Sequence, residues 1–367
     1  MKVIKKERKL IFMAIVALTL FGTLMVYESS SLYAYKNLAD ASYFFKKQFI
    51  FFLVGLSVFF SMLFLDLELL RKHNKEFLIS IIFFLILIIF IGKKVGGSKR
   101  WFYFLGFNFQ PSELLKVAFL LYCADYFSRK DGLIKNFKAG LVPLGIVLGG
   151  ICILLLLQPD LGTALFLVMW TFIYLFLYGA KRKHLVLIIV FGVIASFFLI
   201  KFYPYRFKRI LAYCDPFADP QGAGFQSIQS QIAYGEGGIF GVGFGSSCQK
   251  LFFLPAAHTD FIFSIIAEEF GLWGALLVLY VFFVILYKMG SIAVGMENRF
   301  KRGILWGVVF IFSLEVVINV GVSCGLLPIT GLPLPFISYG GSNLISHYIL
   351  LGLFFNASRG EEVRCKK

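Results

Sequence analysis

Long apolar segments are the feature that most constrains how this chain can fold. A helix needs roughly 20 residues to cross a hydrocarbon core of about 30 Å. Ten segments of about this length, each bounded by a polar or Gly/Pro break, occupy residues 10–27, 48–65, 77–92, 112–127, 139–157, 163–179, 184–203, 261–287, 303–327 and 336–357. With 59% hydrophobic residues, the chain has more apolar surface than a water-soluble fold can bury. The sequence therefore predicts an all-α polytopic membrane protein of about ten transmembrane helices.

The basic residues predict how these helices are oriented. The formal net charge is +16, and most Lys and Arg residues lie in short connections between apolar segments. If the N-terminus is cytoplasmic, the cytoplasmic segments hold roughly 23 basic residues and the outer segments about 12, as the positive-inside rule requires. We therefore expect both termini in the cytoplasm. The charge orients the protein and does not indicate binding to nucleic acid.

The chain is expected to form one membrane domain over residues 1–367, because no repeat, low-complexity tract or linker divides it. Its longest hydrophilic segment, 204–260, would form a large extracytoplasmic loop between the seventh and eighth helices. Cys214 and Cys248 share this loop, where an oxidising compartment allows a disulfide between them.

Two outer clusters combine basic and aromatic residues: Arg206, Lys208 and Arg209 in the long loop, and Lys99, Arg100 and Trp101 after the third apolar segment. Cations on the outer side oppose the positive-inside rule, so they need another explanation. Their charge-assisted hydrogen bonds suit phosphate oxygens, which predicts a phosphate-bearing ligand. Attraction to anionic lipid headgroups is the alternative.

Asp260 lies where the long loop meets the eighth apolar segment, directly after His258 and Thr259. A carboxylate at a dry boundary loses solvation, so its pKa rises toward the range of a general base. The alternative is that Asp260 caps the helix behind it. Upstream, a glycine-rich stretch that ends in Gln249 and Lys250 either approaches a ligand through its backbone or packs tightly.

Charged residues also fall within predicted spans, where an unpaired charge is costly. Glu113 and Lys116 lie at i and i+3 on one helical face, which predicts a structural ion pair, with contact to substrate as the alternative. Asp160 either caps the sixth helix or contacts substrate. The other ionisable residues in or near spans should face the bundle interior or water: Glu268, Glu269, Glu315 and His347.

Seven segments carry a resemblance to a known family: MVYESSSLYAY, GSKRW, FQPSELLK, LLQPDLGTA, YRFKRILAYCDPFADPQGAGFQ, GFGSSCQKLFFLPAAHTDFIFSIIAEE and GLLPITGLPLPFISYGGS. In this order they resemble the shape, elongation, division and sporulation proteins, whose members include FtsW, RodA and SpoVE. The loop sequence is more similar to the division and sporulation branch, whereas TGLPLPF resembles the elongation branch, and we favour the FtsW branch. Ala256 departs from the family, which commonly has Glu there.

The resemblance implies a GT-C-like ten-helix fold and a peptidoglycan glycosyltransferase that polymerises lipid II, the undecaprenyl-linked disaccharide pentapeptide. It matches the family's essential carboxylate with Asp260, so we expect this residue to be catalytic. Contacts to substrate and pyrophosphate are expected from Lys99, Arg100, Trp101, Arg206, Lys208, Arg209, Gln249, Lys250, His258 and Thr259. A divalent cation, Mg or Mn, is a candidate cofactor with no ligands assigned.

The resemblance also implies partners and a location. We expect a class B penicillin-binding transpeptidase of the FtsI type and other divisome membrane proteins as partners, at the division septum in a bacterial cytoplasmic membrane. A lipid II flippase or a non-catalytic divisome scaffold is the alternative function. A RodA-type role in elongation or a SpoVE-type role in sporulation is the alternative within the family.

Overall fold

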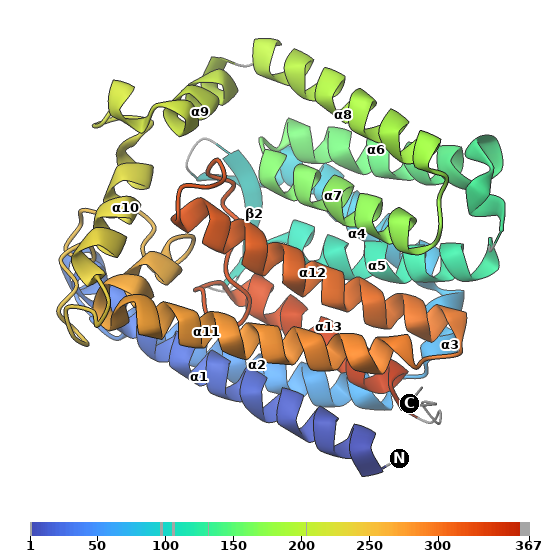
Figure 1. The fold of residues 1–367 in the computed structure, drawn as a ribbon, viewed down its shortest axis with the longest axis horizontal. Helices are drawn as coiled ribbons and strands as arrows, with labels where there is room; N and C mark the ends of the chain where they lie inside the picture. Colours follow the sequence, from blue (N-terminus) through green and yellow to red (C-terminus); the bar gives the residue numbers. More distant parts are fainter. Residues whose placement is uncertain (1, 96–97, 105–106, 131, 203, 360–367) are drawn as a thin grey trace.

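Long helices make up most of the computed structural model, which describes residues 2–95, 98–104, 107–130, 132–202 and 204–359 (Figure 1). Each of the ten predicted apolar segments coincides with one long helix: α1 (Lys2–Leu38), α2 (Tyr43–Phe64), α4 (Asn74–Ile91), α5 (Pro111–Arg129), α6 (Val142–Leu157), α7 (Leu161–Leu177), α8 (Arg182–Phe202), α11 (Ile262–Val294), α12 (Arg299–Ser323) and α13 (Gly341–Ala357). Among the described residues, six helices are long and apolar enough to cross a membrane. A mostly helical polytopic membrane protein is therefore confirmed, and the number of crossings stays a prediction.

The predicted long loop contains regular structure. Residues 204–260 form α9 (Pro204–Cys214), a 3-10 turn (Pro216–Ala218) and α10 (Phe225–Gly237) before an irregular stretch that leads to α11. Shorter elements elsewhere are α3 (Leu67–Lys72), a 3-10 turn (Leu133–Lys135) and a π-helical turn (Phe137–Leu141) that leads into α6.

The all-α prediction was wrong between α4 and α5. Three strands form a small antiparallel sheet in the order β1 (Lys93–Val95), β2 (Ser98–Phe104) and β3 (Phe107–Phe109). Phe102 pairs with Phe109, and Tyr103 pairs with Asn108. Aromatic residues favour strands. The three strands within residues 93–109 are too short to show an alternating strand pattern that stands out beside the long apolar helices.

Helices α5, α12 and α13 lie at the centre of the bundle, and α4, α7, α11 and α2 pack around them. Small residues let these helices approach closely. On α12, Gly303 and Gly307 offer their carbonyl oxygens to Tyr174 Oη at 2.7 Å and Trp170 Nε1 at 3.0 Å of α7. A side chain at Gly303 would begin only 2.8 Å from Tyr174 Oη.

The two ends of the bundle differ in character. The start of α1 and the end of α13 lie at one end, near α3, whereas the β-sheet, α9 and α10 lie toward the opposite end (Figure 1). The apolar helices therefore separate a terminal end from a loop-rich end, and the latter holds the candidate functional site.

Gly22 of α1 provides a test of this packing. A Cβ atom there would lie 2.5 Å from Ile337 Cα, whereas one at Gly149 of α6 would meet nothing within 4 Å. Gly22→Ala should therefore lower stability by about 1–3 kcal/mol through overpacking, and Gly149→Ala should not. Thermal unfolding midpoints of the purified variants in detergent measure the difference, and equal midpoints would contradict the packing of α1 against the 336–337 segment.

Candidate functional site

Asp260 lies two residues before α11, at the loop-rich end of the bundle. Its backbone oxygen accepts a hydrogen bond of 2.9 Å from Asn319 Nδ2 of α12, and the same amide nitrogen donates to Leu332 O at 2.9 Å. A Cβ atom at Gly331, whose φ is +76°, would lie 3.6 Å from Asp260 Oδ2. The 331–332 segment therefore passes beside the Asp260 carboxylate.

The helix-capping interpretation of Asp260 is not supported by the geometry. Helix α11 has Phe261 at its N-cap position, and no side chain of the described residues caps it there. The Asp260 side chain is half-buried. Burial raises the pKa of Asp260 to about 6, although Arg100 and Arg209 act in the opposite direction. Near neutral pH such a carboxylate is mostly ionised and basic enough to accept a proton from a hydroxyl in a transition state.

Arg100, on β2, is held by the turn between α6 and α7. Its Nε donates to Gln158 O at 3.4 Å, an Nη donates to Pro159 O, and Nη1 lies 3.5 Å from Asp160 Oδ1. Asp160 also caps α7 by accepting from the backbone nitrogen of Thr163 at 3.3 Å and from its hydroxyl at 2.9 Å. Asp160 therefore both caps α7 and positions Arg100.

Arg209 approaches the site from α9. Its Nη1 donates to Ile329 O at 3.2 Å, two residues from Gly331. Arg209 also borders a pocket of about 540 Å³, whose other lining residues are Gln221, Gly222, Ala223, Phe225, Gln226, Pro255 and Ile329. The neighbouring predicted cations, Arg206 and Lys208, have side chains that lie outside the described residues.

The segment that carries His258, Thr259 and Asp260 is attached to the stretch before α13. Ser338 Oγ donates to Thr259 O at 2.6 Å and accepts from Leu334 N at 2.8 Å, while Tyr339 N donates to His258 O at 2.9 Å. Sequence reasoning did not single out Ser338 or Asn319. The sequence could have indicated Asn319, because a polar amide side chain within the predicted apolar span 303–327 needs a hydrogen-bond partner.

His258 is a neutral, packed residue in this geometry. Its ring centroid lies 4.8 Å from that of Phe44, 5.7 Å from Tyr339 and 6.0 Å from Tyr33. Burial lowers the pKa of His258 to about 4. At neutral pH this imidazole therefore supplies no positive charge to a pyrophosphate.

Lys99 and Lys250, which were predicted to contact substrate, instead bind other parts of the protein. Lys99 Nζ donates to Ile89 O at 3.1 Å, at the C-terminal end of α4. Lys250 Nζ lies 2.9 Å from Glu28 Oε2 of α1 and 3.0 Å from Glu269 Oε1 of α11. These contacts favour structural roles for both lysines. Trp101 lies on β2, next to Arg100.

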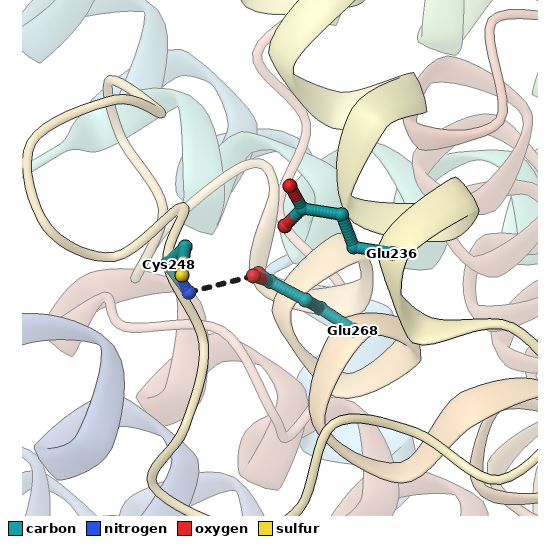
Figure 2. A group of neighbouring side chains, drawn as sticks. All are labelled: Glu236, Cys248 and Glu268. Carbon is teal, nitrogen blue, oxygen red and sulfur yellow. Dashed lines mark hydrogen bonds between the residues drawn. The ribbon is translucent and has the colours of Figure 1, made fainter.

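Gln249 belongs to a turn that is anchored by Glu268. The Glu268 carboxylate accepts hydrogen bonds from Ser247 Oγ at 2.5 Å, Cys248 N at 2.7 Å and Gln249 N at 3.2 Å. Together with Glu236 and Cys248, Glu268 forms a group whose potential metal-binding atoms lie within 4.8 Å of one another (Figure 2). Because three donors already occupy Glu268, the arrangement favours an anchored turn over a metal site.

The thiols of the long loop are not paired. Cys214 and Cys248 are both free and exposed, so the structure contradicts a disulfide between them. Cys248 instead uses its backbone nitrogen to bind Glu268, which fixes its position in the anchored turn.

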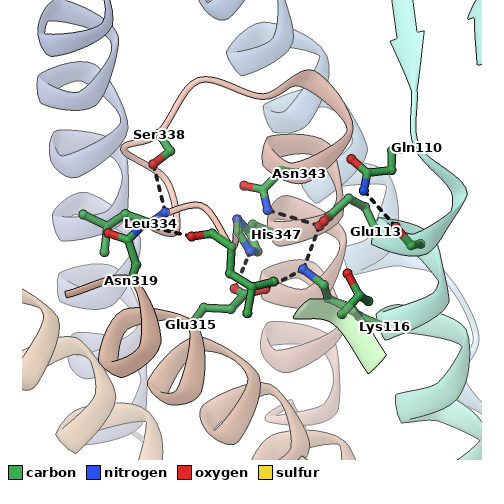
Figure 3. Close-up of polar contacts among 12 residues, drawn as sticks. Gln110, Glu113, Lys116, Glu315, Asn319, Leu334, Ser338, Asn343 and His347 are labelled. Atoms are coloured by element: carbon green, nitrogen blue, oxygen red, sulfur yellow. Dashed lines mark hydrogen bonds and ion pairs between the residues drawn. The ribbon is translucent and has the colours of Figure 1, made fainter. Parts of the chain in front are cut away.

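A buried charged network inside the bundle connects α5, α12 and α13. Lys116 Nζ of α5 is 2.9 Å from Glu113 Oε2 and 2.7 Å from Glu315 Oε1 of α12 (Figure 3). Glu315 also lies 2.7 Å from His347 Nε2, and Asn343 Nδ2 donates to Glu113 at 3.1 Å. The predicted ion pair of Glu113 and Lys116 is therefore present, and Lys116 also binds a second carboxylate, that of Glu315, which lies 199 positions away in the sequence. The expectation that the intramembrane ionisable groups face inward is confirmed, since all are buried: Glu268, Glu269, Glu315 and His347.

Comparisons with known proteins agree with this geometry. Residues 8–363 match the FTSW_RODA_SPOVE family, described as cell cycle protein. The probable peptidoglycan glycosyltransferase FtsW of Trichlorobacter lovleyi is 41% identical over 355 residues, which cover 95% of this chain and 92% of the relative. Stage V sporulation protein E of Bacillus subtilis is 38% identical over 353 residues, with coverage of 95% and 96%.

Solved structures show the same fold. One, described as "Structural coordination of polymerization and crosslinking by a peptidoglycan synthase complex", has a TM-score of 0.77 and 30% identity and covers 95% of this chain and 96% of that chain. The rod shape determining protein RodA of Thermus thermophilus has a TM-score of 0.70 and 26% identity, with 95% of each chain covered. These similarities confirm the resemblance that the seven segments indicated.

The buried network leads to a stability prediction. Lys116→Met would leave Glu113 and Glu315 buried without their shared countercharge, so we expect a loss of about 3–5 kcal/mol. The control is Lys46→Met, which removes a lysine 62% exposed that pairs with Asp40 and should cost at most about 1 kcal/mol. Thermal unfolding in detergent compares the two.

Adding Glu315→Gln to Lys116→Met should restore part of the lost stability, because one of the two uncompensated carboxylates is removed. If Lys116→Met unfolds at the same temperature as Lys46→Met, the network is not the stabilising element described here.

Proposed function

The chain belongs to the FtsW, RodA and SpoVE family of cell cycle proteins, and from this premise we propose that it is a peptidoglycan glycosyltransferase that polymerises lipid II. The observation that carries the proposal is the half-buried Asp260 carboxylate, with a raised pKa, in the electric field of Arg100 and Arg209. Relatives that match nearly the whole chain are named peptidoglycan glycosyltransferase FtsW, which supports this activity.

The proposed reaction is an inverting displacement at the donor sugar. The 4-hydroxyl oxygen of the acceptor N-acetylglucosamine attacks C1 of the donor N-acetylmuramic acid and forms a β-1,4 bond. Asp260 accepts the hydroxyl proton, and the bond between C1 and the pyrophosphate oxygen breaks with its electron pair on the leaving undecaprenyl pyrophosphate. Asp260 then releases its proton to water, which returns the carboxylate for the next cycle.

Positive charge for the leaving group is assigned to Arg209 and Arg100. Arg209 borders the pocket of about 540 Å³ and is the more exposed of the two. Arg100 is oriented by Asp160 and the carbonyl of Gln158. Guanidinium groups bind phosphate oxygens through paired hydrogen bonds and so stabilise the charge that develops on a pyrophosphate.

A divalent cation, Mg or Mn, remains part of the proposal as an ion brought by the substrate. Among the described residues, the three-ligand group at Glu268 is the only one of its kind, and it does not include Asp260. Mg²⁺ is commonly held by one or two carboxylates together with substrate phosphates, which fits this site better than a resident metal centre does. When bound, such an ion would neutralise charge on the pyrophosphate.

The membrane arrangement and the partners complete the proposal. All ten long helices would cross a bacterial cytoplasmic membrane, with both termini in the cytoplasm and Asp260 on the outer side. A class B penicillin-binding transpeptidase is the proposed partner, because a similar solved structure is described as a peptidoglycan synthase complex that coordinates polymerization and crosslinking. We propose that this chain acts in septal cell-wall synthesis with other divisome proteins. A role in elongation or sporulation is the alternative.

A flippase is less compatible with the interior of the bundle. Alternating access needs a substrate site near the membrane midplane. Inside the bundle the charged side chains of Lys116 and Glu315 pair with each other at 2.7 Å, and both are 0% exposed. The groups assigned to the proposed reaction, Asp260, Arg100 and Arg209, lie at the loop-rich end.

Replacing Asp260 tests the catalytic assignment. Asp260→Asn keeps the size of the side chain but removes the base, so lipid II polymerisation should fall at least about 100-fold. The control is Asp215→Asn, which changes an exposed aspartate of the same loop segment and should keep full activity. Gel analysis of glycan strands made by purified protein, with and without the co-expressed transpeptidase, measures both.

Equal polymerisation by wild type and Asp260→Asn would remove Asp260 from the mechanism. Absence of polymerisation by the wild type, even with the transpeptidase, would instead favour the flippase or scaffold function.

The pH dependence tests the electrostatics of the site. Because the base form of Asp260 exists above its pKa of about 6, activity should rise with pH through about 6 and level off above it. Arg209→Gln removes a cation that lowers this pKa, so the rise should move to higher pH. Lys99→Gln should leave the midpoint unchanged, since Lys99 Nζ binds Ile89 O and Lys99 is not among the groups that shift the pKa of Asp260. An unchanged midpoint in Arg209→Gln would contradict this arrangement.

A further inference from the structure

A second pocket lies at the terminal end of the bundle, far in the fold from Asp260. It has a volume of about 410 Å³ and is formed where the start of α1 meets the ends of α2 and α13. Its lining combines two kinds of side chain: the cations Lys5, Arg8, Lys9 and Arg359, and the apolar residues Phe12, Phe59, Phe60, Leu63 and Phe355. The proposed glycosyltransferase reaction uses none of them.

The two arginines are held in place by the pocket wall. The Arg8 guanidinium carbon lies 5.1 Å from the centre of the Phe355 ring. Arg359 Nη1 donates to Leu63 O at 2.6 Å, at the end of α2, and its guanidinium carbon lies 6.0 Å from the centre of the Phe64 ring. Both cations are therefore held at the pocket wall, and within the described part of the chain these contacts use one guanidinium donor of Arg359.

Within the part of the chain that the structure describes, these cations have no acidic neighbour in the pocket lining. The Arg8 and Arg359 guanidinium groups repel each other. Glu7, which precedes Arg8 in the sequence, pairs with Lys288 of α11 at 3.1 Å. Like charges brought together without an acid favour an anion that binds between them.

The apolar wall indicates what kind of anion fits. Phe12 and Phe59 stack with ring centres 5.1 Å apart inside the pocket. The outward-facing Phe60 and Phe64 are 48% and 83% exposed, as expected of side chains that face lipid tails. A ligand with both a phosphate and a hydrocarbon chain would match the cations and the aromatic wall together.

The geometry points to a binding site for an anionic phospholipid, with its phosphate between Arg8 and Arg359 and an acyl chain along Phe12, Phe59 and Phe60. Lys5 and Lys9 add attraction to the headgroup. A free phosphate would use only the cations and leave the aromatic wall uncovered. Each basic residue near a membrane surface strengthens the attraction to anionic lipid, so the two arginines together predict a preference of roughly tenfold or more over a zwitterionic lipid.

Native mass spectrometry of the detergent-purified full chain tests the site. Phosphatidylglycerol and phosphatidylcholine with identical acyl chains are titrated separately, and the affinity of the first bound lipid is compared. The wild type should bind phosphatidylglycerol roughly tenfold more tightly. Arg8→Gln combined with Arg359→Gln should abolish the preference, whereas Arg8→Lys combined with Arg359→Lys should keep most of it.

The matched control is Lys72→Gln combined with Lys75→Gln, which removes two exposed cations from α3 and α4, outside the pocket. This variant should keep the full preference, and a loss equal to that of the arginine variant would overturn the site in favour of general surface charge. Full competition by excess glycerol phosphate would assign the cations to a soluble phosphate and overturn the lipid proposal. Phosphatidylglycerol binding that requires removal of residues 361–367 would make the chain's own tail the occupant, with the same consequence.

Discussion

The fold depends on a lysine that is buried with its countercharges. Lys116 joins α5 to α12 through Glu315, and Glu113 extends the contact to Asn343 of α13. A lone ammonium group in this interior would be prohibitively costly, whereas one shared by two carboxylates is tolerated. Because Lys116 needs its carboxylate partners, the network fixes α5, α12 and α13 relative to one another. Apolar contacts, which are less specific, pack around this network.

Helix α12 connects this network to the candidate site, because it carries both Glu315 and Asn319. Glu315 lies one helical turn before Asn319, whose amide nitrogen holds both the backbone of Asp260 and that of Leu332. The stretch before α13 supplies Ser338, which holds Thr259. The loop segment that carries the carboxylate is thus attached at two points to elements that meet in the network. The charged network and the segment that carries Asp260 are therefore connected through α12 and the stretch before α13.

Sequence reasoning succeeded where the physics is local. Apolar length predicted where the long helices lie, and i, i+3 spacing brought Glu113 and Lys116 together. It failed where partners are distant in the chain. Lys250, for example, pairs with Glu28 at a separation of 222 positions, so its predicted role in binding pyrophosphate could not be weighed against this contact. The β-sheet was also missed, because three short strands carry little periodic signal beside long apolar helices.

Arg100 is held in place by the protein before any ligand binds. The guanidinium is oriented by Asp160 and by carbonyl groups of the α6–α7 turn, all of which belong to the protein itself. The positive charge of Arg100 therefore lowers the pKa of Asp260 without any bound ligand. Water and flexible side chains have to reorient as charge moves during a reaction, whereas a fixed dipole or cation does not. In the proposed reaction, strand β2 would thus preorganise the site electrostatically, and the free-energy cost of ordering Arg100 would arise during folding and not in each catalytic cycle.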